Sequence, residues 1–317
     1  MKIIFNFIGI LVLIIQFAFR GNIESRLVNK DEKFLLGKSL FYDSILSLNR
    51  DLSCGTCHLQ RNSFSYIEEK RYGISKRVTI IKSVPQLFNI KSDGYYLSDG
   101  SIKTLSLQVY KPVRNPEEMN LSWKSATERV NKERRYKELF RQIYLTETID
   151  SSQIVDALTY FVENLISNES RFDKWNRNEV KLTELEYDGY LFFCGDVANC
   201  SNCHELDIQK QIKLANNSSF QCEDRHELND KMVNFHKTPR LVNIALTFPY
   251  MHDKRFESLE DVLLYYSSNP CSRGIASDSD PLKRRTFSDY EKKALLAFLN
   301  SLTDTIALNS PKFKKGM

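Results

Sequence analysis

Glycine and proline are scarce in this chain, with 11 and 8 residues among 317. Gly-rich dinucleotide folds and β-sandwiches with many turns need more of both, so the shortage disfavours these folds and favours helices. An excess of one charge is also lacking, because 45 Lys and Arg against 40 Asp and Glu leave a formal net charge of +5. Since nucleic-acid binders carry a dense basic stripe, we expect no nucleic-acid partner.

What the chain does contain is typical of a folded protein. Hydrophobic residues make up 42% and charged residues 27%, which excludes wholesale disorder and a membrane chain with many spans. At roughly 100 to 200 residues per domain, the length favours two domains. Alternation of the kind that predicts strands is rare, so we expect a mostly α-helical fold with long irregular loops.

Helices are predicted by apolar spacing and by capping patterns. Apolar residues recur at helical spacing over residues 154–166, and Ser152 is the expected N-cap of that helix. Thr183 followed by Glu186 matches a capping box and predicts a second helix.

The first 21 residues are typical of an export signal. A Met-Lys start precedes an apolar run over residues 3–19, which Arg20 closes. We expect residues 1–21 to be a signal peptide or an N-terminal anchor, since the run approaches the ~17-residue lower limit of a membrane span. No cysteine lies near the end of this segment, which excludes a lipid-modified cysteine there.

Two identical Cys-x-x-Cys-His frames are the most informative feature. They consist of Cys54, Cys57 and His58, and of Cys200, Cys203 and His204. In this order two thiols add to the vinyl groups of a haem, and the adjacent His becomes the proximal iron ligand. A zinc ribbon needs no His after each pair, and a thioredoxin-like site has one pair near a βαβ pattern. Each frame therefore predicts one covalently bound haem c.

The spacing of the frames predicts one haem in each domain. We expect an N-terminal haem domain over residues 22–167 and a C-terminal haem domain over 168–317, with the boundary at the polar stretch 167–181. Three further cysteines allow at most one intramolecular disulfide, and the sequence leaves the pair open. They are Cys194, Cys222 and Cys271.

Other segments, in order along the chain, resemble one known family. They are LGKSLFYDSILS at 36–47, VPQLFN at 84–89, SDG at 98–100, LQVYKPVRNPEEM at 107–119 and TPRLVNIALTFPYMHD at 238–253. Together with the frames they resemble the bacterial dihaem cytochrome c peroxidases and the related dihaem enzyme that matures a tryptophan-derived quinone cofactor.

The resemblance implies two cytochrome c-like haem domains with different tasks. The N-terminal haem would reduce hydrogen peroxide to water, and the C-terminal haem would relay electrons to it from a small c-type cytochrome or copper protein. With the export signal at the N-terminus, we expect a periplasmic location. Family peroxidases are commonly dimers, which makes a homodimer an expectation here, although no interface can be recognised in the sequence.

Two residues match the peroxide site of the family. Splitting an iron-bound peroxide requires a group that moves a proton from the inner to the outer oxygen and a hydrogen-bonding group that fixes the bound oxygen. Glu118 and Gln108 match the family's acid-base Glu and its companion Gln. The alternative is an exposed acid beside Glu117 and a Gln at a turn.

Tyr266 matches the position of the distal ligand of the second haem. Family peroxidases carry Met there, whereas the quinone-maturing relative has Tyr. A phenolate oxygen stabilises ferric iron and higher oxidation states, and a thioether stabilises ferrous iron. Tyr265 is a competing ligand, because the match to the family can slip by one residue. Met251 is the other competitor.

The chain departs from the family pattern at two places near the haems. The loop over residues 72–77 has no His to block the first haem, so we expect that haem to be open at rest. Ser98 replaces the Trp that lies between the haems, so the electron must take another route. Tyr95 or Tyr96 is a hypothetical substitute.

A calcium site between the domains is a further expectation from the resemblance. Ser83 replaces the Asn of the family's calcium site, whereas Thr247 and Pro249 match the positions whose carbonyls complete it. Because oxygen ligands are few and partly lost, calcium is left open.

Two other functions compete with the peroxidase. One is a Tyr-ligated dihaem oxidase that acts on a protein or small-molecule substrate through high-valent iron; Tyr266 favours it and Ser98 disfavours it. The other is a dihaem electron carrier without catalysis, which Gln108 and Glu118 disfavour.

Overall fold

The structure is a computed structural model that describes residues 30–66, 71–72, 79–80, 84–216, 235–251, 254–268 and 286–316. Among these residues no helix is both long and apolar enough to cross a bilayer. Several sequence expectations concern positions outside the described residues: the N-terminal segment 1–21, the loop residues 73–77, Ser83, Cys222 and Cys271.

The described chain is mostly helical, which confirms the predicted fold class. Its strands form two short antiparallel pairs, β1 (Arg71–Tyr72) with β2 (Thr79–Ile80) and β3 (Leu214–Asn216) with β4 (Phe235–Lys237). Residues 30–42 form the first helix. The other α-helices are α2 (Cys54–Cys57), α3 (Leu105–Arg114), α4 (Trp123–Lys132), α5 (Arg134–Tyr144), α6 (Ser151–Glu163), α7 (Arg171–Asn176), α8 (Glu184–Cys194), α9 (Leu259–Ser268), α10 (Asp289–Ser301) and α11 (Thr305–Asn309).

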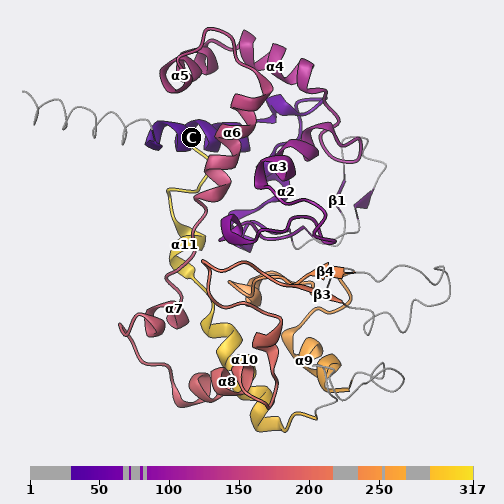
Figure 1. Cartoon of the computed structure of the whole chain (residues 1–317), viewed down its shortest axis with the longest axis vertical. Coiled ribbons are helices and arrows are strands. Elements are labelled where there is room, and N and C mark those ends of the chain that lie inside the picture. Colours follow the sequence, from indigo (N-terminus) through magenta and orange to yellow (C-terminus); the bar gives the residue numbers. More distant parts are fainter. Residues whose placement is uncertain are drawn as a thin grey trace, which may run out of the picture.

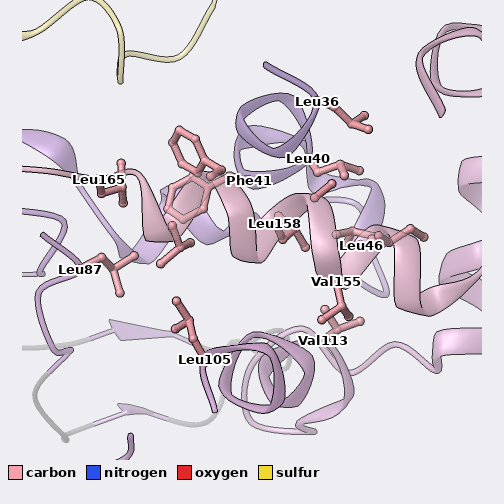
Figure 2. Packing of buried hydrophobic residues seen from close by; sticks show 14 of the residues in the cluster. Leu36, Leu40, Phe41, Leu46, Leu87, Leu105, Val113, Val155, Leu158 and Leu165 are labelled. Carbon is pink, nitrogen blue, oxygen red and sulfur yellow. The ribbon is translucent and has the colours of Figure 1, made fainter. Parts of the chain in front are cut away.

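The buried side chains form two separate cores, which correspond to the two lobes in Figure 1. The first core packs α6 between the helix of residues 30–42 and α3; in Figure 2, Val155 of α6 points toward Val113 of α3. The second core is built around α8, α9 and α10. Ala307, Leu308 and Phe313 belong to the first core, so the end of the chain returns to the first lobe.

The N-terminus of α6 differs from the prediction. Asp150, and not Ser152, is the N-cap, because its carboxylate accepts a hydrogen bond from the Gln153 backbone at 3.0 Å. The Gln153 side chain accepts from the Asp150 backbone at 3.1 Å and completes a capping box. Ser152 lies inside the helix and donates to Asp150. The predicted capping box at Thr183 and Glu186 is confirmed at the start of α8.

The close packing of α8 on α10 depends on Gly189. A Cβ at this position would lie 1.9 Å from the carbonyl oxygen of Ala294 in α10. Backbone of a packed helix cannot yield as a flexible side chain can, so the two helices approach this closely because residue 189 has no side chain.

Replacing Gly189 with Ala is therefore expected to lower the stability of the folded protein. Overpacking a core costs about 1–3 kcal/mol or more, and separating α8 from α10 would disturb the second core. Thermal unfolding of the haem-loaded protein measures the effect. Gly316→Ala is the matched control, since a Cβ there meets no atom within 4 Å. Equal melting temperatures for both variants would contradict the packing argument.

Candidate functional site

The first Cys-x-x-Cys-His frame forms a single helical turn. Cys54 and Cys57 bound α2, and the His58 backbone N–H donates to the Cys54 carbonyl at 2.9 Å. This turn brings the two thiols and the imidazole close together. Gly55 is needed inside it, because a Cβ there would lie 2.4 Å from the ring of Tyr42.

The imidazole of His58 is oriented by a backbone carbonyl. Its Nδ1 lies 2.7 Å from the carbonyl oxygen of Phe64. A carbonyl only accepts, so Nδ1 carries the proton and the lone pair is on Nε2. This tautomer presents Nε2 as the ligand atom, and such carbonyl partners are typical of metal-bound histidines.

The second frame repeats the arrangement. The His204 backbone N–H donates to the Cys200 carbonyl at 2.9 Å, and Nδ1 of His204 lies 3.0 Å from the carbonyl oxygen of Pro239. Burial lowers the pKa of His204, which favours the neutral imidazole that a metal requires. Lys213 holds the turn by donating to the Asn202 carbonyl at 2.6 Å.

The two frames fit covalently bound haem and not a shared zinc ion. All their Cys and His side chains are half-buried. Each frame supplies two thiols beside an imidazole whose Nδ1 faces a backbone carbonyl, which leaves Nε2 as the ligand atom. Within the described part of the chain, no three His, Cys, Asp or Glu residues are grouped so that they could hold a bare metal ion. The donor set of each frame therefore matches one haem c.

Glu118 lies at the first frame. The turn that carries it folds back on α3, with Glu118 N donating to Asn115 O at 3.0 Å and the buried Met119 donating to Pro112 O at 3.2 Å. The pKa of the Cys54 thiol is raised to about 12, first by burial, then by the charges of Cys57 and Glu118. The Glu118 side chain is half-buried, while the neighbouring Glu117 is exposed.

Gln108 lies on α3, whose buried residues Leu105 and Val113 face the first core. Its Oε1 is buried and has no hydrogen-bond partner among the residues that the structure describes. Buried amide oxygens are nearly always bonded, so this unpaired oxygen fits a site that receives a polar ligand. The alternative considered from the sequence, a Gln at a turn, is wrong, because Gln108 lies inside α3.

Tyr266 of α9 lies against the second frame. The pKa of its hydroxyl is raised, first by burial and then by the charges of Cys200 and Cys203. The ring of Tyr265 packs on Phe256 at a centroid distance of 5.2 Å. Tyr266 and Cys200 of the second frame pack against the same core, and the ring of Tyr265 contacts the rings of both Phe256 and Tyr266.

The residues matched to a calcium site are only partly described. Thr247 and Pro249 follow the 3-10 turn Ile244–Leu246, and the Thr247 hydroxyl donates to the Ile244 carbonyl at 3.2 Å. Ser83 lies outside the described residues. The calcium ion stays a prediction.

Ser98, which stands where the family pattern has Trp, lies at the boundary of the two lobes. The carbonyl of Ser98 accepts from Lys237 N at 2.7 Å. Tyr96 is buried, and the pKa of its hydroxyl is raised to about 12, mainly by burial and next by Asp93. Lys103 lies over the ring of Tyr95 at 3.9 Å.

Sequence reasoning missed the buried ion pair beside Tyr96. Asp93 accepts from Arg240 Nε at 2.6 Å and from Lys237 Nζ at 2.7 Å. Both Asp93 and Arg240 are buried, and the Arg240 guanidinium also donates to the carbonyls of Asp207 and Lys210. The only sequence signal was a pair of opposite charges 147 residues apart.

Comparisons with known proteins agree with this arrangement. A family model described as di-haem cytochrome c peroxidase matches residues 31–181. The methylamine utilization protein MauG of Methylorubrum extorquens is 31% identical, covering 86% of this chain and 78% of that protein. Cytochrome c551 peroxidase of Nitrosomonas europaea is 28% identical, covering 88% and 81%. The crystal structure of a MauG-like protein associated with microbial copper homeostasis has a TM-score of 0.77 at 29% identity, covering 89% and 92%.

Proposed function

The chain belongs to the di-haem cytochrome c peroxidase family, and from this premise we propose that it reduces hydrogen peroxide to water. The peroxide would react at the haem held by Cys54, Cys57 and His58. Electrons from a small c-type cytochrome or copper protein would enter at the haem of the second frame. We further propose that each haem belongs to its own lobe and that the protein acts in the periplasm.

The haem, when bound, supplies the iron that activates peroxide and exchanges electrons. The chain supplies the groups around it. His58 would hold the haem iron through Nε2, with its Nδ1 bonded to the Phe64 carbonyl. Glu118 would serve as the acid-base group that accepts and returns the proton needed for peroxide cleavage. Gln108 would orient the peroxide through its side-chain amide.

The observation that carries this proposal is that α3 holds Gln108 with a buried, unpaired Oε1 and that the turn bearing Glu118 folds back onto the same helix. An electron carrier needs no acid-base group at that point. The test is peroxide-dependent oxidation of a reduced small c-type cytochrome by the haem-loaded protein. Equal, near-background rates in the wild type and in Glu118→Gln would support the non-catalytic carrier instead.

Tyr266 favours a second candidate within the same family. A phenolate ligand on the second iron would stabilise higher oxidation states, as a Tyr-ligated oxidase of a protein or small-molecule substrate requires. Because burial raises the pKa of the Tyr266 hydroxyl, its deprotonation needs a nearby positive charge such as ferric iron. A product search with peroxide and no electron donor separates this oxidase from the peroxidase.

The ligand assignment gives a direct spectroscopic prediction. Tyr266→Phe removes the only ligand oxygen of that side chain, so the low-spin ferric signal of the second haem is expected to disappear. Tyr265→Phe is the matched control, since that ring packs on Phe256, and its spectrum should remain that of the wild type. Electron paramagnetic resonance of both ferric variants measures this. Loss of the low-spin signal in Tyr265→Phe alone would reverse the assignment.

A further inference from the structure

The two loops that orient the proximal histidines are joined by one side chain. Ser63 directly precedes Phe64, and Arg240 directly follows Pro239. Gln86 lies between them: its Oε1 accepts from the Ser63 hydroxyl at 2.8 Å, and its Nε2 donates to the Arg240 carbonyl at 2.9 Å. We call Ser63, Gln86 and the Arg240 backbone the Gln86 bridge.

The bridge completes a continuous path between the two imidazoles. It begins at His204, whose Nδ1 donates to Pro239 at 3.0 Å, and it ends at His58, whose Nδ1 donates to Phe64 at 2.7 Å. Between these ends there are only covalent bonds and the two hydrogen bonds of Gln86. All four hydrogen bonds have ordinary lengths for strong protein contacts.

We propose that the Gln86 bridge carries electrons from the second haem to the first, a step that rests on the function proposed above. Each transfer oxidises the iron ligated by His204 by one electron and reduces the iron ligated by His58 by one electron. No atom moves along the bridge. Two such electrons, with two protons, convert one hydrogen peroxide into two waters.

The amide of Gln86 is held in a single orientation. The Arg240 carbonyl only accepts, so it must face Nε2, and Oε1 then faces the Ser63 hydroxyl. Ser63 is fully buried and also accepts from Asn243 Nδ2 at 3.2 Å. Hydrogen bonds in such a low-dielectric interior polarise one another, and electron tunnelling decays less across them than across a van der Waals gap.

The other end of the bridge is equally fixed. The Arg240 side chain is anchored by Asp93 at 2.6 Å and by the Lys210 carbonyl at 2.6 Å. The Arg240 carbonyl is therefore held in place for Gln86. Tyr96, the aromatic alternative, lies buried beside this ion pair. The Gln86 bridge, in contrast, ends on the two loops that hold the histidines.

The test is the rate of electron equilibration between the haems of the haem-loaded protein. One electron is injected by laser photoreduction without oxygen or peroxide, and absorbance follows its passage to the first haem. Gln86→Leu removes both hydrogen bonds and keeps a side chain of similar size. We expect the rate of electron transfer between the haems to fall at least about tenfold, which is the usual loss when a residue that supports a metal ligand is replaced. Ser167→Ala is the matched control, because Ser167 bonds to Asn243 and Asp304 in the same buried region without joining the bridge.

The midpoint potentials of both haems are measured in every variant. The proposal would be overturned if the equilibration rate fell less than tenfold in Gln86→Leu, or if it fell equally in Ser167→Ala. It would also be overturned if changed midpoint potentials accounted for the lower rate. If Gln86→Leu does not fold with both haems bound, Ser63→Ala removes the hydrogen bond at the other end of the bridge, and the same tenfold criterion applies to its rate. Since no peroxide is present, absent peroxide turnover with normal electron equilibration would contradict the proposed function and leave the bridge intact.

Discussion

Replacing Glu118 with Gln is expected to lower the rate of peroxide reduction by about 10²- to 10⁴-fold, the usual contribution of a positioned acid-base group. The amide has nearly the same size and cannot take a proton from the inner peroxide oxygen. The turn should persist, because it is held by backbone bonds of Glu118 to Asn115 and of Met119 to Pro112. Steady-state turnover with a reduced c-type cytochrome measures the loss.

Glu117→Gln is the matched control for this variant. The neighbouring carboxylate is exposed and the substitution makes the same change in charge. Its turnover should equal that of the wild type, and the spectra of both variants should show two intact haems. Equal losses in the two variants would show that the net charge of the turn matters and would contradict the acid-base role of Glu118.

Replacing Asp93 with Ala is expected to give the largest loss of stability. It leaves Arg240 buried without its carboxylate partner, and breaking a buried ion pair in this way costs about 3–5 kcal/mol. For a chain of this size the melting temperature should fall by about 10 °C. Because Asp93 and its partners Arg240 and Lys237 belong to different lobes, the loss should include the contact between the lobes.

Two further variants check the cause. Glu138→Ala breaks the exposed pair with Arg134 and should change the free energy of unfolding by less than about 1 kcal/mol. The double variant Asp93→Leu with Arg240→Met removes both charges and should recover much of the lost stability. A double variant as unstable as Asp93→Ala would indicate that shape, and not the unpaired charge, is responsible.

The sequence predicted those parts of the site that depend on local spacing. Each Cys-x-x-Cys-His frame needs only one helical turn, so Cys54 and His58 could be assigned from five consecutive residues. The capping box at Thr183 was equally local. At α6 the prediction of Ser152 as N-cap was wrong, because Gln153 reaches back to the backbone of Asp150 and completes a capping box there.

The remainder depends on contacts between distant parts of the chain. The carbonyls of Phe64 and Pro239 carry no side-chain signal, so their role at the histidines could not be recognised. Gln86 meets Arg240 across 154 residues, and no periodicity indicates such a pairing. The return of Phe313 to the first core is likewise a tertiary contact, made by a segment that follows the predicted boundary at residue 168.

The electron paramagnetic resonance spectrum of the resting ferric protein tests the central claim most directly, namely that two haems have different tasks. We predict two components of equal integrated intensity: one high-spin, from a first haem whose distal side is open beside Gln108 and Glu118, and one low-spin, from a second haem closed by Tyr266. Two low-spin components, or a single haem signal per chain, would contradict the account.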